Sequence, residues 1–160
     1  MSDALSRLAT VWRTAIEAEL PGAIRLRHEL HATPDLSGSE EPTARRVLAA
    51  ILDGDGSPID TQVVAGTGRL LRLGPPGPAV GLRSELDALP LRERTGAPWA
   101  STSGAMHACG HDVHLAGLVA VLRAARRLEL PVGLVALLQP REEVGPTGAS
   151  DSQGAPSRRV

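Results

Sequence analysis

One short segment, Ala105 to His114, holds three of the chain's five histidines and its only cysteine. Its sequence is Ala-Met-His-Ala-Cys-Gly-His-Asp-Val-His. Thiolate and imidazole groups bind zinc, and manganese, cobalt or nickel also fit where carboxylates join them. Cys109 and His111 are separated by one residue, so both side chains can approach one cation from a turn that precedes a helix. The segment therefore predicts a transition-metal site that includes Cys109 and His111.

Two adjacent acids, Glu142 and Glu143, follow an apolar run at residues 132–138 that is typical of a central strand covered on both faces. Neighbouring residues at a strand end point in opposite directions, so one carboxylate can bind the metal while the other faces a substrate. Metal-assisted hydrolysis needs this division, because the ion acidifies a water molecule and a nearby carboxylate accepts its proton. The pair therefore predicts hydrolytic chemistry beside the metal site.

Each of these residue types also has a more ordinary structural interpretation. A lone cysteine is usually a small buried hydrophobic residue, and a pair of glutamates is usually solvated. Glu85 and Asp87, which follow a short apolar run, fit either a site at a strand end or a solvated loop, and spacing alone leaves both interpretations open. The joint occurrence of cysteine, histidine and the glutamate pair at the ends of adjacent predicted elements favours the metal site.

Hydrophobic periodicity predicts four helices, with a break at Pro21-Gly22 between the first two, over residues 4–20, 23–31, 40–52 and 112–128. Short extended runs predict four strands, over residues 61–65, 69–73, 79–82 and 132–138. This order favours an α/β fold with a right-handed crossover from the third strand to the fourth.

Four polar residues in the N-terminal region receive structural interpretations. His28 and His31 are predicted to lie at the surface or to cap the end of a helix, where a cation is favoured. Glu40 and Glu41 are predicted to match the dipole at the start of the next helix.

The composition suits one globular domain of 160 residues, with 42% hydrophobic and 22% charged residues. The net charge of −1 predicts no general attraction to nucleic acid or to a membrane. A single cysteine excludes an internal disulfide framework. Neither a signal peptide nor an apolar run of the ~18–20 residues needed to span a membrane is recognisable, so a cytoplasmic protein is expected.

Four segments of the chain resemble, in the same order, the N-terminal part of the M20 metallopeptidase and amidohydrolase superfamily. They are Arg27–Ser37 with Glu40, Leu82–Pro90, Gly104–His114 and Leu138–Glu143. The resemblance is strongest to the branch that contains hippurate hydrolases, N-acyl-amino-acid amidohydrolases and auxin-conjugate hydrolases. It implies an α/β, zinc-peptidase-like catalytic domain with a mixed sheet flanked by helices.

The resemblance also implies roles for individual residues. Cys109, His111 and Glu143 would be metal ligands, Glu142 would be the general base, and Asp87 would orient a ligand. Family members carry two divalent ions, commonly zinc or manganese, and hydrolyse the linear amide of an N-acylated amino acid such as hippurate. No firm role follows for Glu85 or for His114, which is expected to be structural or near the site.

The chain also departs from the family pattern. No histidine follows His114, the inserted dimerisation domain through which family members pair is absent, and Arg141 stands where the family usually has alanine. These departures predict a partial catalytic domain at residues 1–145, truncated before the dimerisation domain, and a disordered non-family tail at residues 146–160.

The predicted function is therefore metal-dependent hydrolysis of N-acyl amino acids, with reduced or no activity and an incomplete metal site. The expected partner is the small-molecule substrate, without nucleic acid or membrane. Two alternatives stay open: a catalytically inactive metal-binding remnant, and a structural module whose motifs are inherited but unused. The sequence leaves open whether another chain completes the site.

Overall fold

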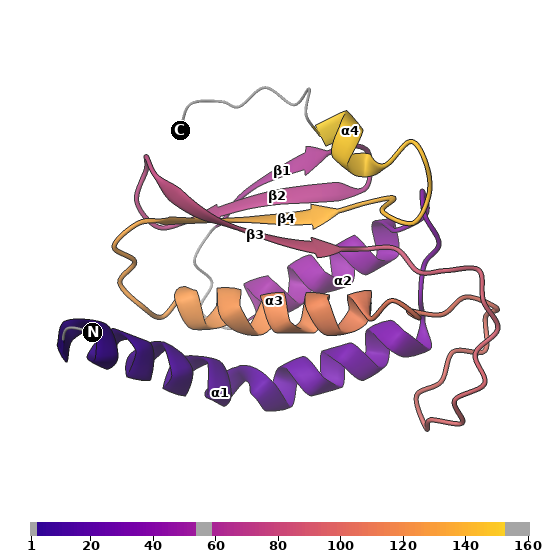
Figure 1. Cartoon of the computed structure of the whole chain (residues 1–160), viewed down its shortest axis with the longest axis horizontal. Coiled ribbons are helices and arrows are strands. Elements are labelled where there is room, and N and C mark those ends of the chain that lie inside the picture. Colours follow the sequence, from indigo (N-terminus) through magenta and orange to yellow (C-terminus); the bar gives the residue numbers. More distant parts are fainter. Residues whose placement is uncertain (1–2, 54–58, 153–160) are drawn as a thin grey trace.

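The computed structural model describes residues 3–53 and 59–152, which form a mixed sheet with helices (Figure 1). The elements are, in chain order, α1 Asp3–Ala32, α2 Glu41–Leu52, β1 Asp60–Val64, β2 Gly68–Leu73, β3 Ala79–Glu85, α3 His111–Ala125, β4 Gly133–Gln139 and α4 Gly148–Ser152. The strand order is β1-β2-β4-β3, with β3 and β4 parallel and the other pairs antiparallel. The predicted α/β class, with its mixed sheet and flanking helices, is confirmed.

Helices α1, α2 and α3 form two layers over one face of the sheet, as Figure 1 shows. Helices α2 and α3 contact the strands, and α1 packs along α3. Between the sheet and the helices lies the main hydrophobic core. The described residues that fill it are mostly leucine, valine, isoleucine and alanine. Its fully buried members include Leu30, Ile51, Leu71, Leu115, Leu122 and Leu138. Within the described residues, no helix has the length and apolar character that a membrane crossing requires.

The predicted break at Pro21 is wrong, because α1 runs without interruption over Asp3–Ala32. A proline inside a helix removes one backbone hydrogen bond and costs about 3 kcal/mol. Packing against α3 and the core offsets this cost, since Ala23, Leu26 and Leu30 are all buried beyond the proline. Tertiary burial thus overrides the local helix-breaking signal.

Helix α4 was not predicted, because the composition of residues 146–160 predicts disorder. Residues Gly148–Ser152 form this short helix. It is tied to the end of β4, since the amide of Gly148 donates to the carbonyl of Arg141 and the Arg141 guanidinium pairs with Asp151. Residues 153–160 of the predicted tail lie outside the described residues.

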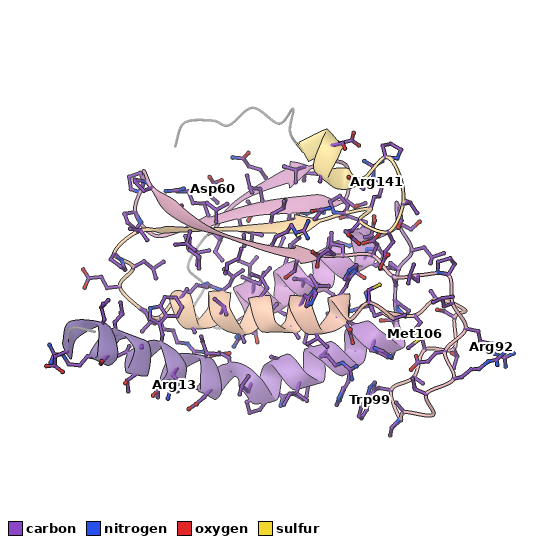
Figure 2. The ribbon with its side chains drawn as sticks, viewed as in Figure 1. Arg13, Asp60, Arg92, Trp99, Met106 and Arg141 are labelled. Atoms are coloured by element: carbon purple, nitrogen blue, oxygen red, sulfur yellow. The ribbon has the colours of Figure 1, made fainter. Side chains whose placement is uncertain are left out.

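The long loop at residues 86–110, between β3 and α3, is fastened to the C-terminal end of α1. The ring of Trp99 stacks on His28 with centroids 3.7 Å apart (Figure 2). His31 lies in the last turn of α1 but is buried, which corrects its expected surface position. Its Nδ1 lies 2.8 Å from Asp112 Oδ2 and its Nε2 lies 3.0 Å from Glu93 Oε1. This histidine therefore connects α1, the loop and the start of α3.

The carboxylate of Glu93 holds the loop together. Burial alone would raise the pKa of Glu93, but hydrogen bonds from the Thr95 hydroxyl, the Ser101 amide and His31 lower that pKa to about 2. Because the ionised form accepts these bonds in the folded protein, folding is coupled to the ionisation of Glu93.

Replacing Glu93 by glutamine should lower the free energy of unfolding at pH 7, because the ionised acceptor is lost. The folded-state pKa lies below the ordinary value of 4.5, so the stabilisation is present above that value and is lost as the pH falls toward 2. Denaturant unfolding at pH 7 and at pH 3 should show a smaller difference between wild type and Glu93→Gln at the lower pH. The exposed Glu129→Gln serves as the control, and an equal difference at both pH values would contradict this role of Glu93.

Candidate metal centre

The candidate site lies where the parallel strands β3 and β4 both end. Because parallel strands end at the same edge of a sheet, the segments that follow them are brought together. The amide of Leu86, just after β3, donates to the carbonyl of Gln139 at the end of β4 over 2.9 Å. Helix α3 begins at the same edge with His111 as its first residue. Three separate segments thus meet at one place.

Three side chains converge there: His111, Glu142 and Glu143. One potential ligand atom from each lies within 4.8 Å of the other two, and the described residues contain no other group of three or more acidic, histidine or cysteine side chains that meets this condition. His111 Nε2 lies 3.8 Å from Glu142 Oε2 and 3.9 Å from Glu143 Oε1. These separations are too long for hydrogen bonds, and Glu143 Oε1 is buried without a hydrogen-bond partner. One imidazole nitrogen and two carboxylate oxygens therefore fit a divalent cation such as zinc or manganese.

The imidazole of His111 is oriented by the backbone. Its Nδ1 lies 2.8 Å from the carbonyl oxygen of Asp87. A carbonyl oxygen only accepts hydrogen bonds, so Nδ1 donates, and a neutral ring then keeps the lone pair of Nε2 for a cation. The side chain of this histidine is almost fully buried, which limits its freedom to rotate away.

The side chain of Asp87 holds the backbone of Glu143. It is completely buried, and its Oδ2 accepts hydrogen bonds from the Ser37 hydroxyl at 2.6 Å and from the Glu143 amide at 2.9 Å. Asp87 therefore contacts His111 through its carbonyl and Glu143 through its carboxylate. Its other oxygen, Oδ1, lies 3.7 Å from His111 Nδ1 and has no hydrogen-bond partner.

Cys109 is exposed in the turn before α3, beside the three converging side chains but outside their 4.8 Å group. Gly110, with φ of 80°, turns the chain between Cys109 and His111, a conformation that glycine adopts without strain. A hydrogen bond to Glu143 raises the pKa of the Cys109 thiol, and burial and the negative charges of Glu143 and Glu142 raise it further. The thiol is therefore protonated until a cation compensates these charges.

Glu85 and His114 form a separate pair at the edge of the site. His114 Nδ1 lies 3.0 Å from Glu85 Oε2, while Arg83 binds the other oxygen of Glu85 at 2.8 Å. Burial opposes ionisation, but these partners lower the pKa of Glu85 overall. The ring of His114 is 57% exposed and its centroid lies 6.0 Å from that of His111. His114 therefore lies near the three converging side chains without joining them.

The role of Glu40 differs from the dipole matching that its position before a helix predicts. The side chain of Glu40 is completely buried and accepts three hydrogen bonds. Its Oε1 binds the amides of Gly38 at 2.8 Å and Arg141 at 2.9 Å, and its Oε2 binds the Thr67 hydroxyl at 2.7 Å. Glu41 instead pairs with Arg69, at 2.7 Å. The sequence held one indication of a role near the site: Glu40 belongs, with Arg27–Ser37, to the first family-like segment.

Comparison with known proteins points to one family. The model of peptidase family M20/M25/M40 matches residues 81–156, a range that contains Asp87, Cys109, His111, Glu142 and Glu143. The match extends into residues 146–160, which were predicted to form a non-family tail. A Bacillus subtilis (strain 168) protein named as a candidate amidohydrolase, YhaA, is 41% identical over 131 residues, which are 79% of this chain and 33% of that protein.

Two further relatives show the same pattern. An N-acetylcysteine deacetylase of Bacillus subtilis (strain 168) is 35% identical over 125 residues, covering 76% of this chain and 33% of that protein. The crystal structure of the Bacillus subtilis YXEP protein, described as a dinuclear metal-binding peptidase of the M20 family, aligns with a TM-score of 0.73 at 32% identity. That alignment covers 86% of this chain and 40% of the other. The chain thus spans about a third of the length of the curated relatives it matches.

Removing the charge of Glu143 should make Cys109 more acidic, because the hydrogen bond to Glu143 and its negative charge both raise the thiol pKa. We expect the pH midpoint for alkylation of Cys109 by iodoacetamide to move to lower pH in Glu143→Gln, in metal-free buffer. The exposed Glu17→Gln should leave the midpoint unchanged. An unchanged midpoint in Glu143→Gln would show that Glu143 does not act on the thiol.

Proposed function

Because this chain belongs to peptidase family M20/M25/M40, we propose that it carries the metal-binding part of a hydrolase for the amide bond of N-acyl amino acids. The observation that carries the proposal is the convergence of His111, Glu142 and Glu143. The three come from the start of α3 and the segment after β4. Glu143 Oε1, which is buried without a hydrogen-bond partner, lies 3.9 Å from His111 Nε2.

In this proposal His111, Glu143 and Cys109 hold the ion. Glu143 suits a ligand because its side chain is only 16% exposed and its buried Oε1 has no other partner. His111 suits a ligand because its Nδ1 is used by the carbonyl of Asp87, which leaves Nε2 available. Cys109 joins as a thiolate, giving up the thiol proton that otherwise forms its hydrogen bond to Glu143.

Glu142 is the proposed general base. When bound, the divalent ion supplies Lewis acidity for the attack of water on the amide carbonyl. The side chain of Glu142 is 39% exposed, against 16% for Glu143, so it can reach a water molecule on the open side of the site. It takes the proton from the attacking water and delivers it to the amide nitrogen as the C–N bond breaks, which yields a carboxylic acid and a free amine. Asp87 keeps the His111 ring and the Glu143 backbone in place.

The proposed substrate class and the proposed metal are supported by the relatives. One relative is named a deacetylase of N-acetylcysteine, which supports an N-acyl amino acid as the substrate class, and hippurate is the first member to test. A related structure is described as dinuclear, while the described residues here contain one group of three converging side chains. We therefore propose one zinc or manganese ion in this part of the site. A cytoplasmic location and a small-molecule substrate belong to the same proposal.

A second candidate function is metal binding without turnover. It is favoured by one observation: the described residues contain one group of three converging side chains, whereas the related structure is described as dinuclear. Three protein ligands are enough for one catalytic zinc ion, but the loss of supporting groups usually costs about 10–100-fold in metal affinity or activity.

The deciding experiment measures bound metal and turnover on the same protein. We expect about one equivalent of zinc or manganese and release of glycine from benzoylglycine. Glu142→Gln should keep the metal and lower turnover by about 10²–10⁴-fold, because only the base is removed. The exposed Glu129→Gln, which lies beyond the C-terminal end of α3 while His111 is at its start, is the matched control. Metal without turnover in wild type would favour the second candidate, and a protein that binds no metal would contradict both.

A further inference from the structure

The two glutamates of the site lie on a segment that no regular structure supports. Residues 140–147 follow β4 without belonging to a strand or a helix. Arg141 has φ of 50°, in the left-handed region that side-chain-bearing residues seldom adopt. Glu142 and Glu143 also carry like charges beside one another. Contacts other than the backbone hydrogen bonds of a sheet or helix must therefore fix this corner, residues 140–147.

Two buried carboxylates hold the corner by its backbone. Glu40 Oε1 accepts from the amide of Arg141, and Asp87 Oδ2 accepts from the amide of Glu143, each over 2.9 Å. Both carboxylates are completely buried, and they come from the start of α2 and the end of β3. Hydrogen bonds to an ionised acceptor are stronger than those between neutral groups. The amides on either side of Glu142 are thus fixed from two directions.

Asp87 also contacts His111, through its backbone carbonyl, whereas the hydrogen bonds of Glu40 reach no proposed ligand side chain. Its other partners are the Gly38 amide and the Thr67 hydroxyl. No ion pair among residues 3–53 and 59–152 includes Glu40. Its buried carboxylate is satisfied by these three hydrogen bonds, and its side chain makes no capping bond to α2. Among the hydrogen-bond partners of Glu40, Arg141 is the one that directly precedes Glu142 and Glu143 in the chain.

We propose that Glu40 is a positioning residue for the metal centre: by holding the Arg141 amide it sets where Glu142 and Glu143 stand relative to His111. This inference rests on the proposed function, because it concerns the cation that those side chains would bind. Glu40 lies about a hundred residues before the glutamates in sequence. Its hydrogen bond to the Arg141 amide therefore joins the start of α2 to the segment after β4. The left-handed backbone of Arg141 is kept by this bond.

The test uses cobalt(II), because its absorption bands report the geometry of the bound ion as well as its affinity. Glu40→Asp keeps the buried charge but shortens the side chain by one methylene, which withdraws the acceptor from Arg141. Glu40→Gln keeps an oxygen for the Gly38 and Arg141 amides and an amide group that can donate to Thr67. Thr67→Val is the matched control, since it breaks a hydrogen bond of Glu40 without touching Arg141.

We expect Glu40→Asp to weaken cobalt binding by about 10–100-fold and to change the absorption bands, with Glu40→Gln restoring wild-type bands. Thr67→Val should be less stable to denaturant yet bind cobalt as wild type does. Amide hydrogen exchange, followed for folded protein without metal, should show faster exchange at Arg141 in Glu40→Asp but not in Thr67→Val.

Three outcomes would overturn the inference. If Glu40→Asp binds cobalt with wild-type affinity and bands, Glu40 does not position the site, while the proposed function stands. If Thr67→Val changes the bands as much as Glu40→Asp, the effect is general destabilisation. If wild type itself binds no cobalt, zinc or manganese, the proposed function fails and this inference fails with it. Should Glu40→Asp not fold, the comparison of Glu40→Gln with Thr67→Val decides: changed bands in the former alone contradict the hydrogen-bond mechanism.

Discussion

The concentration of negative charge around one imidazole is the constraint on which the site depends. Asp87, Glu142 and Glu143 all lie close to His111, and the same charges raise the pKa of the Cys109 thiol. Acidic groups brought together in a partly dry environment repel one another, and like charges cost more there than in water. A divalent cation relieves this repulsion, which is why the arrangement is better explained as a metal centre than as a packing feature.

The fold brings these charges together through the pairing of β3 with β4. Their parallel register aligns Glu85 with Gln139, so the chain leaves both strands at the same level of the sheet. Helix α3, which connects them, returns underneath the sheet and starts at the same edge with His111. A register shift of one residue would turn every side chain of β4 to the opposite face and carry the glutamate pair away from the histidine. The aliphatic core that fixes this register therefore also fixes the site.

The parts of this arrangement that could be predicted are those encoded by local spacing. The position of His111 at the start of a helix, the apolar run before Glu142 and the strand–helix–strand order all appear within short windows of sequence. The continuity of α1 through Pro21 could not be predicted, because it depends on burial against α3. The burial of His31 depends on two carboxylates far along the chain, and no window contains these partners.

The supporting contacts make the site independent of the ion that it would bind. The His111 ring is oriented by a backbone carbonyl, and the two amides beside Glu142 are held by Asp87 and Glu40, none of which needs a cation. In small zinc domains, by contrast, the binding energy of the metal is the folding energy. Here the hydrogen bonds to the amides of Arg141 and Glu143 hold the acidic side chains close together despite their mutual repulsion. The affinity for a cation then reflects relief of charge, with little rearrangement of the chain, and a change that loosens the backbone weakens binding without removing any ligand.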